Sequence, residues 1–171
     1  MRLDRLPPRN EAGDFRAVIE SPKGSRHKLK YEPKDRAFRV TQTLPAGMSM
    51  PFDFGFIPGT KADDGDPLDV LVIMDGPAYP GVVVAIHLLG VIEAEQSDDG
   101  AKPYRNDRLI AVAEGSTERG DLRTIGDVDK VLLTQIERWF ETEDGLSGKR
   151  FRPVGRRGPR VARRTLDDAC R

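Results

Sequence analysis

The sequence predicts a mostly β fold with helices (α+β), in which short strands form a closed or partly closed barrel. Three observations lead to this fold class. The apolar stretches are short and rich in β-branched residues, and turn signals such as Ser21-Pro22-Lys23-Gly24 separate them. Many short strands at such spacing are typical of barrels. Only one long segment has the periodicity of a helix, and 171 residues without internal repeats suit a single domain over 1–171.

The strands are predicted in order along the chain. Residues 15–20 form the first, and residues 27–32 form the second, where Leu29 and Tyr31 alternate with charged residues that lie on the other face. Residues 52–57 are aromatic and include Gly55, which favours a tight loop. The remaining predicted strands are residues 37–43, 70–74, 82–92 and 109–113.

Residues 127–142 are predicted to form the main helix. Its apolar stripe, at spacings of three and four, consists of Leu132, Ile136, Trp139 and Phe140. This pattern favours a core role for Trp139 and Phe140 over a platform that stacks on nucleic-acid bases. A second, shorter helix is predicted for residues 165–170.

A basic loop or arm is predicted at about residues 145–164. It is rich in Gly, Pro and Arg, and from Lys149 to Arg164 it carries eight cationic residues and no acid. The whole chain has 28 basic and 28 acidic residues, so no overall field favours nucleic acid or a membrane. Residues 1–8 lack the apolar core of a signal peptide, and residues 82–92 are too short to span a bilayer. Together with the lone Cys170, these features predict a cytoplasmic protein without internal disulfides.

Three carboxylates stand within six positions in Asp64-Gly65-Asp66-Pro67-Leu68-Asp69-Val70. Carboxylates this close repel one another unless a hard cation or a positive group lies among them. Gly65 and Pro67 allow the segment to bend so that all three side chains converge. The alternative is a solvated Asp-Gly turn before a buried strand. A calcium-binding EF-hand loop is excluded, because its glycine and glutamate positions hold Asp69 and Asp75. The pattern favours a magnesium site.

The same segment fits the signature of soluble family I inorganic pyrophosphatases, D-[SGDN]-D-[PE]-hydrophobic-D-hydrophobic, at every position. Further matches to the family's V-I-E-I-P, K-Y-E and Y-G-Y-I-P-x-T segments are Val18-Ile19-Glu20-Ser21-Pro22, Lys30-Tyr31-Glu32 and Phe54-Gly55-Phe56-Ile57-Pro58-Gly59-Thr60. These matches and two later ones cover about residues 13–142 in order. The chain is therefore identified as a divergent member of this family.

The resemblance implies a five-stranded OB-like barrel flanked by one long and one short helix, in a protein that self-associates as a homo-hexamer or trimer. It also implies Mg²⁺-dependent hydrolysis of a phosphoanhydride, by default inorganic pyrophosphate, by a metal-activated water. On the same basis Asp64, Asp66 and Asp69 are metal ligands, and Asp66 is also the catalytic base. Glu20, a catalytic residue, and Glu32, a metal-site residue, are expected to hold metal-bound waters. Lys30 and Arg108 are expected to bind the substrate's phosphate and to act in catalysis.

Several site positions depart from the family pattern. Gln42 stands in place of a phosphate-binding arginine, Met50 and Phe54 in place of two tyrosines, Gln96 and Asn106 in place of two acids, Glu143 in place of a tyrosine and Asp144 in place of a phosphate-binding lysine. Compensation is expected from the inserted residues Asp98, Asp99, Lys102, Arg105 and Asp107, or from the basic arm folding over the site.

These departures leave alternatives to pyrophosphate hydrolysis. One is a catalytically impaired protein that binds metal or phosphate ligands in a structural or regulatory role. Another is a hydrolase with a different phosphoanhydride substrate. Nucleic-acid binding through the barrel and the arm is disfavoured, because the arm offers Phe151 as its single aromatic residue.

Overall fold

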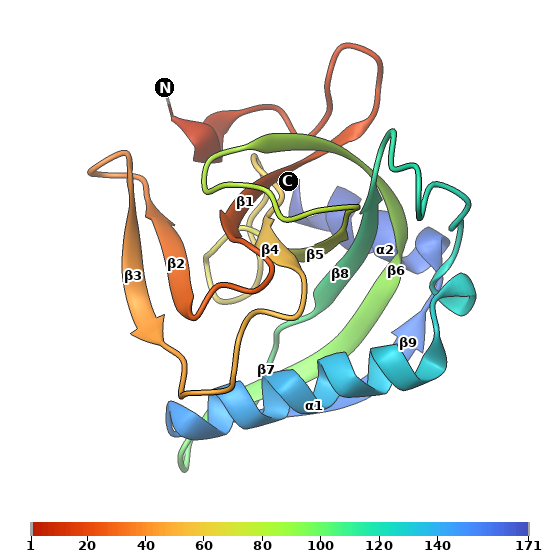
Figure 1. Cartoon of the computed structure of the whole chain (residues 1–171). Coiled ribbons are helices and arrows are strands. Elements are labelled where there is room, and N and C mark those ends of the chain that lie inside the picture. Colours follow the sequence, from red (N-terminus) through yellow and green to blue (C-terminus); the bar gives the residue numbers. More distant parts are fainter. Residues whose placement is uncertain (1, 171) are drawn as a thin grey trace.

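The computed structural model describes residues 2–170, and its centre is a ring of five strands (Figure 1). The strands are β1 (Phe15–Ser21), β4 (Asp53–Phe56), β5 (Asp69–Ile73), β8 (Arg108–Ala113) and β6 (Val83–Asp98). Each pairs with the next in this order, and β6 returns to pair with β1. The β5–β8 pairing is parallel and the other four are antiparallel. The ring confirms the predicted OB-like fold, although it is not an ideal barrel.

Gly55 lies in a strand, so the tight loop predicted for residues 52–57 is wrong. In β4, Gly55 is paired with Ile19 of β1, beside a register shift in that strand. A Cβ atom on Gly55 would lie 1.9 Å from the backbone oxygen of Val18. The glycine is there because two strands approach too closely for a side chain, and not because the chain turns.

Alternation along the ring strands divides the core between the two helices. In β5, Val70 and Val72 belong to the apolar cluster that includes Leu166 of α2 (Pro159–Ala169). The intervening Leu71 belongs to the cluster packed on α1 (Lys130–Leu146). Since successive strand side chains point to opposite faces, one ring of strands supports a helix on each side.

Helix α1 extends four residues beyond the predicted end. Asp129 caps its first turn by accepting hydrogen bonds from the backbone N–H groups of Val131 and Leu132. Phe140 is buried, and the indole N–H of Trp139 donates to the backbone oxygen of Ser49 at 2.8 Å, so the predicted core role of both aromatic residues is confirmed.

The predicted basic loop at 145–164 is wrong. Strand β9 (Lys149–Arg157) pairs with the far half of β6, and α2 begins at Pro159, six residues before the predicted start of the second helix. The sequence looked loop-like because Pro153 and Gly155 interrupt the strand pattern. β9 pairs with β6 alone, an edge position at which strands tolerate proline.

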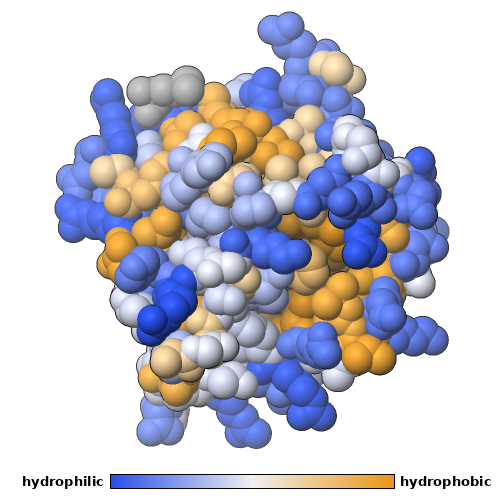
Figure 2. Space-filling model, viewed as in Figure 1, coloured by the Kyte–Doolittle hydropathy of each residue, from blue (hydrophilic) through white to orange (hydrophobic). Residues whose placement is uncertain are grey.

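A separate hairpin covers one side of the ring. It consists of β2 (His27–Glu32) and β3 (Ala37–Thr43), and it is drawn beside β1 and β4 in Figure 1. The remaining elements are the 3-10 helices η1 (Leu3–Arg5) and η2 (Ile125–Asp127) and the short strand β7 (Tyr104–Arg105). On the face in Figure 2, hydrophilic residues predominate, and hydrophobic residues gather in two areas, one near the top and one at the lower right. Within residues 2–170, no helix is both long and apolar enough to cross a membrane.

Candidate active site

One cavity of about 350 Å³ brings together residues from the hairpin, the ring and the C-terminal end of α1. We call it the aspartate cavity. Its charged lining residues are Glu20, Asp64, Asp66, Asp69, Glu143, Asp144, Lys28, Lys30, Lys149 and Arg108. Its remaining lining residues include Gln42, Phe54, Gln96, Tyr104, Asn106 and Ser147. Most of the predicted site residues therefore share one cavity.

The three predicted aspartate ligands all line this cavity. Gly65 has a φ of +90°, a conformation that suits glycine, and it allows the backbone N–H of Asp66 to donate to the Asp64 carboxylate at 3.0 Å. Asp69 follows as the first residue of β5. The segment therefore contains the Asp-Gly turn, and its three aspartates line one cavity.

Two of these aspartates are paired with cationic side chains from other elements. The ammonium of Lys30, on β2, lies 2.5 Å from an oxygen of Asp66. The guanidinium of Arg108, the first residue of β8, lies 2.7 Å from Asp69. Burial raises the pKa of Asp69, and the charge of Arg108 opposes that rise. The two cations expected to bind phosphate are therefore in contact with two of the expected metal ligands.

Gln96, Asn106 and Arg108 form a hydrogen-bonded chain. The side-chain amide of Asn106 donates to Gln96, and its oxygen accepts a hydrogen bond from Arg108. All three residues are buried. These two neutral residues thus orient the arginine instead of presenting free carboxylates to the cavity.

Glu20 lies on β1 and faces the same cavity. Its carboxylate accepts a hydrogen bond from the backbone N–H of Tyr31 at 2.6 Å. Burial raises the pKa of Glu20 to about 8, and the nearby charge of Asp69 adds to the rise. Glu20 therefore retains a proton near neutral pH in the metal-free protein.

Glu32 and Met50 do not line the aspartate cavity. Glu32 lines an adjoining cavity of about 210 Å³, which shares Glu20, Lys30, Asp66 and Asp69 with the first. Glu32 therefore lies beside the aspartate cavity, and its expected role at the metal site stays a prediction. Met50 is buried in the core packed on α1.

Two acids at the end of α1, both named from the sequence as altered site positions, line the cavity. Glu143 is paired with Lys28 of β2 at 2.8 Å. Asp144 is buried, and one of its carboxylate oxygens has no hydrogen-bond partner. Burial raises the pKa of Asp144, and the neighbouring Glu143 raises it further.

Sequence reasoning missed Lys28, Tyr104, Ser147 and Lys149 as lining residues. A signal existed for Lys28, because it lies two positions before Lys30 on one strand face. Lys149 lies at the start of β9, a strand that the sequence presented as a loop. Tyr104 is on β7, and Ser147 directly follows α1. No local sequence pattern places these two residues at the cavity, because the fold alone brings β7 and the end of α1 there.

The inserted residues do not replace the missing acids. Asp107 accepts a hydrogen bond from the backbone N–H of Ala94 and is paired with Arg105, and both side chains line a different cavity. None of the proposed substitutes Asp98, Asp99, Lys102, Arg105 and Asp107 is among the residues that line the aspartate cavity. The expected compensation from this insertion is therefore corrected.

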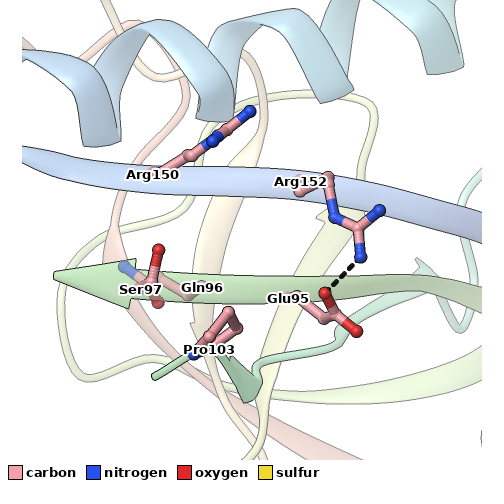
Figure 3. Close-up of a pocket in the computed structure, with 6 residues that line it drawn as sticks. All are labelled: Glu95, Gln96, Ser97, Pro103, Arg150 and Arg152. Carbon is pink, nitrogen blue, oxygen red and sulfur yellow. Dashed lines mark hydrogen bonds and ion pairs between the residues drawn. The ribbon is translucent and has the colours of Figure 1, made fainter. Parts of the chain in front are cut away.

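The predicted arm also lies mostly elsewhere. Figure 3 shows Arg152 of β9 paired to Glu95 on β6, while Arg150 lies across from Ser97 with its side chain pointing away from β6. These residues line a neighbouring pocket of about 340 Å³. From the predicted arm at 145–164, Ser147 and Lys149 are the two residues that line the aspartate cavity.

The donor set of the aspartate cavity suits a hard divalent cation. Six carboxylates face it against four cationic side chains, and acids remain in excess when Glu20 is protonated. The lining oxygens are carboxylates, amides and hydroxyls, the ligands that Mg²⁺ prefers. Within residues 2–170, no three acidic, histidine or cysteine side chains are close enough to form a preformed metal group. Mg²⁺ does not require one, since it commonly binds through one or two carboxylates, waters and substrate phosphates.

Comparison with known proteins shows the family and agrees with the fold. The family model described as inorganic pyrophosphatase matches residues 17–171. The inorganic pyrophosphatase of Thermus thermophilus is 34% identical over 171 residues, which cover 98% of this chain and 95% of that protein. The chain belongs to the inorganic pyrophosphatase family.

Other members agree with this assignment. The inorganic pyrophosphatase of Synechocystis sp. is 33% identical over 87% of this chain and 85% of its own length. The crystal structure of the Thermus thermophilus enzyme superposes with a TM-score of 0.90, at 33% identity, over 99% of this chain and 97% of that one. The Neisseria gonorrhoeae inorganic pyrophosphatase gives a TM-score of 0.85 at 29% identity, over 96% and 94% of the two chains. The protein is thus a diphosphatase-like hydrolase of this family.

Proposed function

We propose that this pyrophosphatase-family protein hydrolyses inorganic pyrophosphate to two phosphates in a Mg²⁺-dependent reaction. The observation that supports it best is the shared cavity of Asp64, Asp66, Asp69, Lys30 and Arg108. Pyrophosphate is an anion, and acids exceed cations in this cavity. Divalent cations that accompany the substrate remove the repulsion.

The roles proposed for the residues follow from their positions. Asp64, Asp66 and Asp69 are the residues that would hold metal ions. When bound, Mg²⁺ supplies charge neutralisation and acidifies a water molecule. Asp66 is positioned to accept the proton of the attacking water once Lys30 turns from it toward phosphate.

Glu20 and the two cations complete the proposed machinery. Lys30 and Arg108 bind phosphate oxygens and neutralise charge that develops on the leaving phosphate. Glu20 orients water through its carboxyl group, which is held by the backbone of Tyr31.

A second candidate is supported by the altered cavity wall. Gln42, Gln96 and Asn106 are neutral, and Glu143 and Asp144 add negative charge. Such a wall suits weak turnover of pyrophosphate, metal or phosphate binding in a regulatory role, or hydrolysis of another phosphoanhydride. The loss of one preorganised charge stabiliser typically costs about 10²- to 10³-fold in rate.

A substrate panel separates these candidates. The purified full chain is incubated with Mg²⁺ and, separately, pyrophosphate, triphosphate and nucleoside triphosphates, and phosphate release is measured with and without a chelator. We expect Mg²⁺-dependent release that is fastest with pyrophosphate. Faster release from another substrate would reassign the substrate, and no release from any would support the regulatory role.

A single domain, self-association and a cytoplasmic location are also proposed. The single domain is supported by the packing of both helices on the same ring of strands. Sedimentation of the purified chain tests the expected trimer or hexamer, and a monomer over the whole concentration range would contradict it.

A further inference from the structure

Asp144 has a buried carboxylate oxygen that nothing in the described protein satisfies. The residue is 4% exposed and lines the aspartate cavity from the last turn of α1. Among side chains of residues 2–170, its Oδ2 and the Nε of Arg108 are the buried polar atoms without a hydrogen-bond partner. A buried carboxylate without a partner is costly, so the atom indicates a missing ligand.

Two of the cations near Asp144 already have other partners, while Lys149 also lines the cavity and its charge opposes the rise that burial causes in the pKa of Asp144. Lys28 is paired with Glu143, and Arg108 directs its NH1 group at Asp69. A carboxylate accepts hydrogen bonds or binds cations, so the phosphate groups of a substrate cannot satisfy Asp144 directly. A cation or a hydrogen-bond donor that enters the cavity from solution can supply the missing partner of the Asp144 oxygen.

We propose that Asp144 binds a divalent cation that enters the cavity together with the phosphoanhydride substrate. This inference rests on the proposed function, because the cation is expected to arrive as a complex with pyrophosphate. A cation bound in this way needs few protein ligands, since substrate phosphates and waters supply the others. A carboxylate with a divalent cation carries a net charge of about +1, the same as the lysine expected at this position from the family resemblance.

The hydrogen bonds of the two neutral residues Gln96 and Asn106 explain why the cation is expected at Asp144. The oxygen atoms of Gln96 and Asn106 are engaged in the hydrogen-bonded chain that ends at Arg108. Gln96 and Asn106 are neutral, and their hydrogen bonds orient the Arg108 side chain. The free buried oxygen lies instead on α1, at Asp144.

Binding stoichiometry tests the proposal without turnover. The full-length protein is titrated with Mn²⁺, with and without methylenediphosphonate as a non-hydrolysable diphosphate, and free Mn²⁺ is measured by electron paramagnetic resonance. Asp144→Asn keeps the shape of the side chain and removes its charge. Glu141→Gln changes an exposed acid on the same helix and is the matched control.

We expect the Asp144→Asn protein to bind one Mn²⁺ fewer per chain than the wild type when the diphosphonate is present, and the same number when it is absent. The Glu141→Gln protein is expected to match the wild type in both conditions. Equal counts for wild type and Asp144→Asn with the diphosphonate would overturn the proposal. A deficit that is as large without the diphosphonate would also overturn it, since the cation would then not arrive with the substrate.

Phosphate release separates this inference from the proposed function. If the wild type releases phosphate from pyrophosphate, but wild type and Asp144→Asn bind equal numbers of Mn²⁺, the cation role of Asp144 is contradicted and the proposed hydrolysis stands. If the wild type releases no phosphate from pyrophosphate, but Asp144→Asn binds one Mn²⁺ fewer, the proposed hydrolysis is contradicted and the cation site stands.

Discussion

The guanidinium of Arg108 lies 2.7 Å from the Asp69 carboxylate and is enclosed by two aromatic rings. Its central carbon is 5.1 Å from the ring centroid of Phe140 and 5.5 Å from that of Phe151. Helix α1 and strand β9 supply these rings. Asp69 and Arg108 are the first residues of β5 and β8. Their ion pair therefore links these two strands, and the contacts of Arg108 with the two rings link them further to α1 and β9.

Arg108→Met is expected to destabilise the protein strongly. Its side chain is 6% exposed, and breaking a buried ion pair typically costs about 3–5 kcal/mol because the other charge loses its partner. We expect the free energy of unfolding in urea to fall by about 3 kcal/mol without Mg²⁺ and by less with it, since a cation compensates Asp69. Arg152→Met, which breaks the exposed pair with Glu95, is expected to cost less than about 1 kcal/mol. Equal losses in the two variants would contradict this account.

The Lys28–Glu143 pair is expected to behave as a coupled unit. Glu143 has a side chain that is 2% exposed, so Lys28→Met leaves a buried charge without a partner and should cost about 3 kcal/mol. The double variant Lys28→Met/Glu143→Leu should recover most of that loss, because apolar replacements of a buried pair are often neutral. Thermal and urea unfolding of the two single variants and the double variant measure the coupling. Additive losses would show that the pair does not act as a unit.

Gly55→Ala is expected to disrupt the pairing of β1 with β4. The new Cβ would lie 1.9 Å from the backbone oxygen of Val18, and overpacking of this kind costs about 1–3 kcal/mol. Gly145→Ala, in the last turn of α1, adds a Cβ with no atom within 4 Å and should stabilise the protein by about 0.5–1 kcal/mol. Urea unfolding of both variants tests the difference. A neutral Gly55→Ala would contradict the close approach of the strands.

Asp75 is expected to make stability depend on pH in the acid range. Its carboxylate accepts hydrogen bonds from the Ser116 hydroxyl and from the backbone and side chain of Thr117, which lower its pKa to about 2. A lowered pKa stabilises the folded state fully above the ordinary value of 3.8, and this contribution disappears as pH falls toward 2. Asp75→Asn should therefore unfold at lower temperature than wild type at pH 7, and the gap should narrow below about pH 4. A gap that stays constant from pH 7 to pH 3 would exclude this role.

The fold was predictable from the sequence where local patterns agree with tertiary packing. The strands ending near Ser21 and Glu32 alternate or are β-branched, and they form as expected. The errors have a common physical cause. Gly55 and the Pro153–Gly155 segment carry turn-like residues, yet strand partners that are distant in sequence hold them in an extended conformation.

The site was predictable to a similar extent. The aspartate turn and Lys30 could be assigned from short matching segments, and all of them line one cavity. The pairing of Arg108 with Asp69 and the burial of Asp144 depend on where α1 ends and how it lies on the ring. Local sequence does not specify that arrangement.

The most direct test of the central claim is phosphate release from pyrophosphate at saturating Mg²⁺ by wild type, Asp66→Asn and Asp63→Asn. Asp63 is an exposed neighbour that does not line the aspartate cavity, so it is the matched control. We expect Asp66→Asn to reduce kcat by at least about 100-fold, the scale of losing a positioned acid–base group, and Asp63→Asn to remain within about twofold of wild type. Equal release by wild type and Asp66→Asn would contradict the account.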